Sequence, residues 1–431
     1  MAGYLALSAL SLLPLSTAQQ VGRVPEKHPR LKTQSCTKHG CVDHYTSVVL
    51  DALTHPIKDI YTGESCVNSS GSYDPSICPT EEECAERCAL EGIDYGKHGV
   101  YTWGDTMKLQ HYVDIDGSLT SVSPRVYLLD PSGYEYQFLH LLNQEFSFTV
   151  DVTDLPCGEN GALYLSEMEA DGGRSHLNPA GATYGTGYCD AQCPNLAWIN
   201  GVANTNGSGS CCNEMDLWEA NARATSYTPH PCNISSLYEC AGDECGPNGV
   251  CDKSGCSFNP YALGDRDYYG YNYVVDTTKP FTVTTQFLTD DGTASGTLSE
   301  IRRLYVQHGR VIKNTVVTSN NRKVDSITDE YCNANYETFE ELGGLTQMGE
   351  AIGRGMVLAF SIWNDAGQFM NWLDSGNSGP CNATEGNPEI IRATNPDTSV
   401  KFSENFDASF DLLCSLSPSE AAMWLGCLEA V

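Results

Sequence analysis

The chain contains 431 residues, of which 24 are lysine or arginine and 55 are aspartate or glutamate, and its formal charge is −31. A surface this acidic repels phosphate backbones and anionic lipid headgroups, which argues against nucleic acids and membranes as partners and leaves neutral polymers open. The 20 cysteines indicate an oxidising compartment and a fold rich in disulfides.

The chain begins with an apolar stretch, residues 1–18, that closes on the small residues Ser16, Thr17 and Ala18. This pattern is typical of a cleaved secretory signal, although no lysine or arginine precedes the apolar core. The alternatives are a buried helix, which Pro14 disfavours, and a membrane anchor, for which the apolar run is too short. We expect residues 1–18 to be removed and the remainder to be secreted.

Most cysteines stand beside glycine, proline, asparagine or aspartate, as disulfide cysteines in loops do. A zinc site formed by pairs such as Cys84/Cys88 or Cys189/Cys193 is the competing interpretation, but no histidine follows at finger spacing. We therefore expect no metal. Sequons for N-glycosylation, which fit an extracellular surface, occur at Asn68, Asn206, Asn233 and Asn382.

The first predicted elements are a helix, a hairpin and a strand. A helix is expected over residues 80–92, where Thr80 and Glu83 form a capping box. Residues 125–138 have two alternating arms around an Asp-Pro-Ser-Gly turn and predict a hairpin. Residues 145–152 alternate apolar and polar side chains, as a half-buried strand does.

The later part of the chain shows the same kinds of pattern. Residues 281–288 alternate as another half-buried strand, and residues 302–312 form a second hairpin pattern. Residues 336–352 predict a second helix. Residues 355–363 are apolar on both faces, which is expected of a central strand covered on both sides.

These patterns predict an all-β fold with few short helices. Many antiparallel strands and many glycines favour two curved antiparallel sheets packed face to face. No linker, repeat or low-complexity segment divides the chain, so we expect one large domain. A curved sheet has a concave face, which suits an extended polymer chain.

The run CCNEMDLWEAN contains three acids, Glu214, Asp216 and Glu219. Residues two apart share a face of a strand, so Glu214 and Asp216 point the same way, whereas Glu219 should point oppositely. A β-bulge between Asp216 and Glu219 would absorb one residue and return the third acid to that face. Glycoside hydrolysis needs two such carboxyl groups, one as acid and one as nucleophile or base.

The spacing also predicts the stereochemical outcome. Four effective strand steps span about 13 Å, and two converging glutamate side chains recover roughly 3–4 Å each, which leaves about 5–6 Å between the carboxyls. That matches the ~5 Å of retaining enzymes better than the roughly 6.5–9.5 Å of inverting ones. The alternative is a solvated acidic strand face. Cys211 and Cys212, which would pin the strand, and Trp218, which would supply an apolar wall, weaken that alternative.

The run, followed by TPHPC, resembles the active-site strand of glycoside hydrolase family 7, the fungal cellulases. The resemblance extends in order through TSVVLD, CGENGALYLSEMEADGG, YGTGYCDAQCP, FNPYALG, YYG, GMVLAFSIWND and MNWLDSGN. It implies a concanavalin-like β-jelly roll with a long substrate cleft, and it implies no metal or organic cofactor.

By this resemblance, Glu214 is the nucleophile and Glu219 the acid/base, while Asp216 and His230 support them. His230 could instead be a structural loop histidine. Trp363 shares a strand face with Ser361 and should face the cleft, whereas Trp372 could equally belong to the core. The residues implied in sugar binding are Tyr164, Tyr188, Asp190, Gln192, Trp363 and Trp372.

The resemblance also implies a disulfide pairing that leaves Cys414 and Cys427 over. The implied pairs are Cys36–Cys41, Cys66–Cys88, Cys78–Cys84, Cys157–Cys381, Cys189–Cys212, Cys193–Cys211, Cys232–Cys251, Cys240–Cys245 and Cys256–Cys332.

Departures from the family pattern refine the expectation. The chain reads ALTHPIKDIY where the family has a Trp/Arg-rich stretch that contributes to distal sugar sites. We expect a single catalytic domain over residues 19–403, an atypical tail over 404–431, and no carbohydrate-binding module. The segments 202–210 and 240–251 are short where exo-acting relatives carry longer loops, which predicts an open cleft.

We therefore expect a secreted, monomeric endo-β-1,4-glucanase that acts on cellulose and related β-glucans by retention. The alternatives are a cellobiohydrolase of the same family and a non-catalytic glycan-binding protein on the same architecture. The preferred glycan among cellulose, mixed-linkage glucan and xylan is left open by the sequence.

Overall fold

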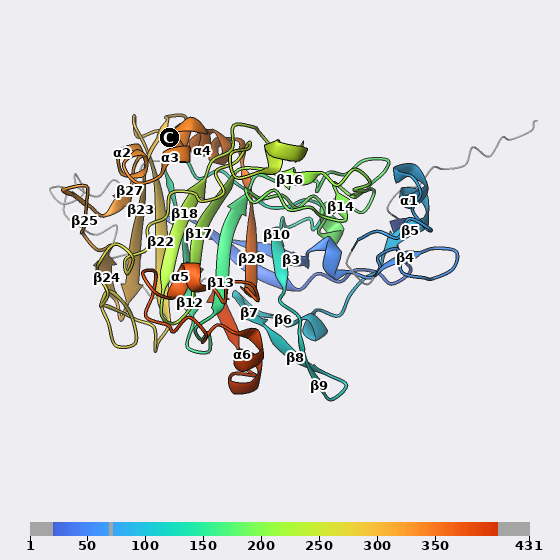
Figure 1. The fold of residues 1–431 in the computed structure, drawn as a ribbon, viewed down its shortest axis with the longest axis horizontal. Coiled ribbons are helices and arrows are strands. Elements are labelled where there is room, and N and C mark those ends of the chain that lie inside the picture. Colours follow the sequence, from blue (N-terminus) through green and yellow to red (C-terminus); the bar gives the residue numbers. More distant parts are fainter. Residues whose placement is uncertain (1–19, 69–71, 404–431) are drawn as a thin grey trace, which may run out of the picture.

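The computed structural model describes residues 20–68 and 72–403 (Figure 1). The expected signal peptide, residues 1–18, lies outside the described residues. The tail 404–431, with Cys414 and Cys427, lies outside them as well.

The first of two large sheets contains the strand that carries the three acids. All of its strand pairs are antiparallel, and the predicted central strand, β28, lies between β13 and β10 with both faces buried. Its order is β18 (Thr225–His230), β17 (Glu214–Ala220), β13 (Glu159–Ser166), β28 (Met356–Asn364), β10 (Arg125–Leu129), β3 (Gly40–Leu50) and β2 (Arg30–Thr37), with β11 (Phe138–Leu139) paired to β28.

The second large sheet is also antiparallel throughout. It pairs the two strands predicted from alternation, which are β12 and β22. Its order is β24 (Arg310–Lys313), β23 (Leu298–Gln307), β22 (Phe281–Thr289), β12 (Gln144–Asp151), β29 (Ser399–Ser403), β7 (Thr106–Gln110) and β6 (Val100–Trp103), with β27 (Ser326–Ile327) paired to β23.

A shared hydrophobic core joins the two sheets. Trp218 of the first sheet packs edge-on against Phe148 of the second, with ring centroids 6.1 Å apart, and Phe360 meets Phe402 at 5.5 Å. Burying each such side chain stabilises the fold by roughly 1.5–3 kcal/mol. The expectation that Trp218 forms an apolar wall beside the acids is wrong, because the bulge turns its fully buried ring into this core.

Short helices lie at the periphery. Figure 1 shows α1, with its adjoining small sheet, at one end of the molecule and α2, α3 and α4 grouped at another. The side chain of Thr80 accepts a hydrogen bond from the Glu83 N–H at the start of α1, which is one half of the predicted capping box. The helix predicted over residues 80–92 is shorter than expected, because it ends at Arg87 and the chain continues into β5 (Cys88–Leu90). The helices are α1 (Glu81–Arg87), α2 (Asp329–Asn333), α3 (Glu337–Glu341), α4 (Gly344–Arg354), α5 (Asn371–Asp374) and α6 (Pro388–Thr394).

The single helix predicted over residues 336–352 is wrong, because the structure divides it into α3 and α4. Leu342 and Gly343 separate the two helices, and Gly343 and the first residue of α4, Gly344, have φ angles of 96° and 56°. Helical residues have negative φ, so two successive glycines in the left-handed region end one helix and allow a new one to start in another direction.

The predicted hairpins differ in extent. His308 and Gly309 connect β23 to β24 with φ angles of 54° and 67°, which is the two-residue type I′ turn expected between antiparallel strands. In the hairpin at residues 125–138, the arms separate after the bridge between Leu129 and Tyr136, and β11 pairs with β28 instead.

Small two- and three-stranded sheets extend the loops of the jelly roll. They are formed by β1 (Gln20–Val21), β4 (Ile57–Asp59) and β5 (Cys88–Leu90), by β8 (Tyr112–Ile115) and β9 (Ser118–Ser121), by β14 (Trp198–Ile199) and β15 (Val202–Ala203), by β16 (Gly209–Cys211) and β19 (Tyr238–Cys240), by β20 (Tyr269–Gly270) and β21 (Val275–Asp276), and by β25 (Val317–Ser319) and β26 (Arg322–Val324).

The structure contains the nine disulfides implied by the resemblance. They are Cys36–Cys41, Cys66–Cys88, Cys78–Cys84, Cys157–Cys381, Cys189–Cys212, Cys193–Cys211, Cys232–Cys251, Cys240–Cys245 and Cys256–Cys332. Within the part of the chain that the structure describes, no helix has the length and apolar character needed to cross a bilayer.

Candidate active site

A cleft of about 1160 Å³ lies over the first sheet. Its lining includes every residue that the sequence proposed for catalysis or sugar binding, although they come from strands and loops far apart in the chain. These residues are Tyr164, Tyr188, Asp190, Gln192, Glu214, Asp216, Glu219, His230, Trp363 and Trp372.

The predicted β-bulge is present in β17. Opposite β13, Tyr164 pairs with Asp216 and Leu163 with Trp218, so that ladder skips Leu217. The register with β18 shifts at the same place, between Asp216 and Glu219. One extra residue therefore restores Glu219 to the face that carries Glu214 and Asp216, and all three line the cleft.

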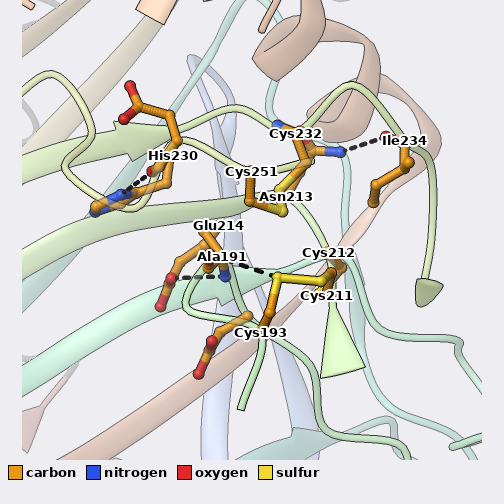
Figure 2. Close-up of a disulfide and its surroundings, with 12 residues drawn as sticks. Ala191, Cys193, Cys211, Cys212, Asn213, Glu214, His230, Cys232, Ile234 and Cys251 are labelled. Carbon is orange, nitrogen blue, oxygen red and sulfur yellow. Dashed lines mark hydrogen bonds between the residues drawn. A yellow bond between two sulfur atoms is a disulfide. The ribbon is translucent and has the colours of Figure 1, made fainter. Parts of the chain in front are cut away.

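Glu214 occupies the start of β17 and is almost buried, with 8% of its surface exposed. The N–H of Ala191 donates a hydrogen bond of 3.1 Å to its Oε2, and this N–H belongs to a loop held by the Cys193–Cys211 disulfide (Figure 2). Burial raises the pKa of Glu214 well above its usual range, and the charges of Asp216 and Asp190 raise it further. The Ala191 N–H favours the ionised form.

Asp216 and His230 form a buried pair that shares one proton. His230 Nδ1 lies 2.8 Å from the carbonyl oxygen of Asp252, which can only accept, so Nδ1 carries a hydrogen. The other contact, 3.0 Å from His230 Nε2 to Asp216 Oδ2, needs a single proton on one of the two atoms. The pair is electrically neutral whichever partner holds that proton. Burial, with the charge of Asp190, raises the pKa of Asp216 to about 8.

Glu219 is partly exposed to the cleft and is fixed by one amide. Asn160 Nδ2 on β13 donates to Glu219 Oε1 at 2.9 Å, which leaves Oε2 as the oxygen that carries a proton in the acid form. The pKa of Glu219 is raised to about 8, first by burial and then by the charge of Asp216.

A hydroxyl chain leads away from Glu214 along the cleft. The hydroxyls of Tyr164 and Tyr188 lie 3.1 Å apart, and Tyr188 donates to Asp190 Oδ2 at 2.6 Å. The guanidinium carbon of Arg125 lies 3.4 Å from the centroid of the Tyr188 ring. Gln192 is exposed and donates from Nε2 to the carbonyl oxygen of Lys253 at 2.8 Å.

Two tryptophans form the opposite part of the cleft. The rings of Trp363 and Trp372 are stacked, with centroids 6.1 Å apart and planes inclined by 29°. Trp363 is half-buried, and Trp372 is 40% exposed. Trp372 is therefore not a core residue, and both rings can offer an aromatic surface to the C–H face of a sugar.

Sequence reasoning missed Asn160, Arg125 and Lys253. Asn160 lies within a motif quoted above, but its contact with Glu219 depends on the register of β13 against β17, which sequence alone does not give. Arg125 is a basic residue at the start of an otherwise apolar strand, and this contrast could have identified it as a candidate site residue. Lys253 Nζ donates to the Gln192 carbonyl oxygen at 2.5 Å, and its loop position carried no signal.

Groups of potential metal ligands occur elsewhere among the described residues, and cysteines dominate them. Their sulfurs are oxidised in disulfides, so they lack the thiolate that binds a metal. Each pair weighed as a zinc site is divided between two disulfides. The groups are Cys66, Cys78 and Cys88; Cys193, Cys211 and Cys251; and Cys157, Asp374 and Cys381.

A β-jelly roll with a carboxylate trio on one face of a bulged strand, beside aromatic sugar platforms, defines a glycoside hydrolase. The chain belongs to a particular family of these enzymes. The family described as "Glycosyl hydrolase family 7" matches residues 21–405, so the chain is a member of glycosyl hydrolase family 7.

Individual relatives agree with the family assignment. The chain is 62% identical to a probable endo-beta-1,4-glucanase celB of Aspergillus terreus, over 92% of this chain and 94% of that protein. The native endocellulase EGI of Humicola insolens matches with a TM-score of 0.85 and 47% identity, over 89% of this chain and 97% of that one. A family 7 cellobiohydrolase from Daphnia pulex matches with a TM-score of 0.84 and 37% identity, over 89% and 97%.

Proposed function

We propose that the protein is an endo-β-1,4-glucanase that cleaves internal bonds of cellulose and related β-glucans with retention of anomeric configuration. The observation that carries the proposal is the bulged strand β17, which directs Glu214, Asp216 and Glu219 into one cleft. The relatives named as an endo-β-1,4-glucanase and an endocellulase support the same activity.

In the proposed mechanism, Glu214 attacks the anomeric carbon while Glu219 protonates the departing glycosidic oxygen from Oε2. The products of this step are a glycosyl ester on Glu214 and a free sugar. Glu219, now ionised, removes a proton from a water molecule that attacks the same carbon and releases Glu214. The amide of Asn160 keeps Glu219 oriented through both steps.

The Asp216–His230 pair explains how Glu214 can ionise in a buried acidic cluster. With one proton, the pair carries no net charge, because the positive character of His230 offsets the repulsion that Asp216, together with Asp190, exerts on Glu214. Loss of that proton would add a negative charge next to Glu214 and raise its pKa. We therefore assign Asp216 and His230 to charge balance and orientation.

The endo-acting assignment is supported by the short segment between the loop at Gln192 and the catalytic strand. Residues 198–203 form a small hairpin of β14 and β15, with a two-residue turn at Asn200 and Gly201. The chain then returns to β16 within a few residues. The higher identity to the Humicola endocellulase than to the Daphnia cellobiohydrolase points the same way.

Viscosity of a soluble substituted cellulose tests this proposal. We expect purified enzyme to lower the viscosity rapidly while few reducing ends form. A slow fall in viscosity with cellobiose as the dominant product would assign a cellobiohydrolase instead. Binding without hydrolysis would assign a non-catalytic glycan-binding protein. Parallel assays on cellulose, mixed-linkage glucan and xylan rank the substrates.

Two further measurements test the chemistry. Glu214→Gln should abolish hydrolysis, and hydrolysis that survives intact would remove Glu214 as nucleophile. Proton NMR of the first product should show the β-anomer, whereas an α-anomer would refute retention.

We also propose that the protein is secreted and acts as a monomer on the polysaccharide. The apolar segment 1–18 and the disulfides support secretion, and the sequon residues Asn68, Asn206, Asn233 and Asn382 are exposed, as glycosylation requires. Amino-terminal sequencing of protein from the culture medium tests cleavage after residue 18. Light scattering of the purified protein tests the oligomeric state.

A further inference from the structure

Arg303 is a charged side chain in an unexpected place. It lies on β23 in the core between the sheets, with 1% of its surface exposed, on the same strand face as Ile301 and Tyr305. Arginine is almost never fully buried without a carboxylate partner. In residues 20–68 and 72–403, no carboxylate lies within ion-pair distance of its guanidinium.

The contacts of Arg303 converge on the catalytic strand of the facing sheet. Its Nη2 donates a hydrogen bond to the carbonyl oxygen of Leu217. Its guanidinium carbon lies 4.4 Å from the ring centroid of Tyr227 on β18 and 6.0 Å from that of Trp218 on β17. Neither Nε nor Nη1 has a hydrogen-bond partner among the described residues. The side chain thus makes one directed polar contact, and that contact is with Leu217.

Leu217 is the residue that creates the bulge. The ladder with β13 passes from Asp216 to Trp218, and the ladder with β18 passes from Asp216 to Glu219, so neither gives Leu217 a partner. An unsatisfied buried carbonyl costs about 1–3 kcal/mol, so a side-chain donor directed at the bulged residue stabilises the bulge. Arg303 supplies such a donor to the Leu217 carbonyl oxygen.

We propose that Arg303 is a positioning residue that holds the bulge at Leu217 and thereby sets Glu219 in line with Glu214. The inference rests on the proposed roles of these two glutamates. Without the donor, the extra residue can relax and Glu219 rotates or shifts relative to Glu214. A displacement of about 1 Å in such a pair can lower the rate about 100-fold.

Stability separates this positioning role from a merely structural one. Arg303→Met removes an unpaired buried charge, which favours the folded state, and also removes a hydrogen bond to the Leu217 carbonyl oxygen, which disfavours it. Because the two effects oppose each other, we expect the thermal unfolding midpoint to change little while activity falls. Arg302→Met is the matched control on the same strand, since Arg302 points outward and pairs with Glu300 at 2.7 Å. The control should keep full activity.

The sharpest readout is the dependence of kcat/KM on the leaving group. Phenyl β-cellobioside needs a proton from Glu219 when its aglycone departs, whereas 2,4-dinitrophenyl β-cellobioside does not, because its aglycone is a stable anion. A misplaced Glu219 therefore harms only the first substrate. For Arg303→Met, we expect kcat/KM to fall about 10- to 100-fold on the phenyl substrate and by less than about threefold on the dinitrophenyl substrate.

Arg303→Lys keeps a cationic donor and should recover most of the activity on the phenyl substrate. An equal loss on both substrates, or no loss on either, would overturn the proposal. Should Arg303→Met fail to fold, the same comparison is made with Arg303→Lys, whose shorter reach to Leu217 predicts a smaller loss confined to the phenyl substrate. Failure of the proposed function is distinguishable, because Glu214→Gln would then retain activity on both substrates.

Discussion

The proton on Glu219 is the residue-level feature on which the proposed mechanism depends. Burial and the Asp216 charge raise the pKa of Glu219 to about 8, so the carboxyl is protonated at neutral pH. As the pH rises through this pKa, the acid is lost. We expect kcat/KM to fall on the basic side with an apparent pKa of about 8, measured on a substrate with a poor leaving group.

Replacing Asn160 tests whether ionisation of Glu219 causes the fall of kcat/KM at basic pH. The Asn160 amide donates to Glu219 and lowers its pKa, because it stabilises the ionised carboxylate. Asn160→Ala should therefore move the basic limb of kcat/KM to higher pH and lower the maximum. A basic limb that moves to lower pH would show that Asn160 does not act on the Glu219 anion.

His230 controls the opposite limb. Its positive character lowers the pKa of Glu214, which must be ionised to attack. His230→Phe should raise that pKa, so that activity is lost at a higher pH as the solution is acidified. The pH dependence of kcat/KM measures the shift. An unchanged acidic limb would refute this electrostatic role.

Gly255→Ala should disturb His230 less severely, by displacing its ring instead of removing it. A Cβ at Gly255 would lie 2.6 Å from His230 Nδ1, and Gly255 has a φ of +61°, so the ring must move from its bond with Asp252. We expect a smaller shift of the acidic limb in the same direction.

At the scale of single elements, patterns within one segment were predictable and contacts between segments were not. The bulge in β17 could be predicted because three acids can share a strand face only if one residue is absorbed. The direction of Trp218 follows from the same bulge, yet the apolar wall expected of it was wrong. The role of Asn160 depends on which residue of β13 faces Glu219, a register fixed by contacts distant in sequence.

The helix predicted over residues 336–352 is divided at two glycines, and the amino-acid composition of the segment does not predict this division. Two glycines inside an apolar helical periodicity reduce helix stability only modestly, so the pattern still favours one helix. The chain adopts positive φ at both glycines, and this choice depends on packing of α3 and α4 against α2 and the second sheet.

Gly344→Ala tests how firmly that break is set. A Cβ at Gly344 would lie 2.7 Å from Asp329 Oδ1, in addition to the strain of an alanine at a φ of +56°. We expect the free energy of unfolding to fall by roughly 2–3 kcal/mol in urea titrations. Gly117→Ala is the matched control, since its φ is +84° with no atom within 4 Å of the added Cβ.

The control should lose only the backbone penalty of about 1 kcal/mol. Equal losses for Gly344→Ala and Gly117→Ala would show that the contact with Asp329 contributes nothing. The kcat/KM of both variants should remain that of the wild type, because neither glycine lines the cleft.

At the scale of the whole molecule, alternation along the strands was enough to predict two antiparallel sheets packed face to face. The order of the strands was not predictable, because β13 and β28 are almost 200 residues apart and pair only through the folded core. The cleft residues were collected by resemblance to a family, since Tyr164, Tyr188 and Trp363 carry no pattern that would unite them.

The tryptophan pair should determine how the whole cleft binds a polymer. Trp363→Ala removes a sugar platform without touching the acids, so KM for a soluble cellulose should rise about tenfold while kcat changes little. Initial rates over a range of polymer concentrations measure both constants. A fall in kcat with an unchanged KM would mean that Trp363 acts on the reacting sugar instead.

The neighbouring cysteines Cys211 and Cys212 attach the start of the catalytic strand to Cys193 and Cys189. Before these sulfurs are joined, the loop that supplies the Ala191 N–H to Glu214 is tethered only by weak forces. The recovery of hydrolytic activity should therefore report on oxidative folding. When a reduced and unfolded chain is allowed to refold and oxidise, we expect its β-sheet circular dichroism signal to return first, and its hydrolytic activity to return only when both disulfides have formed.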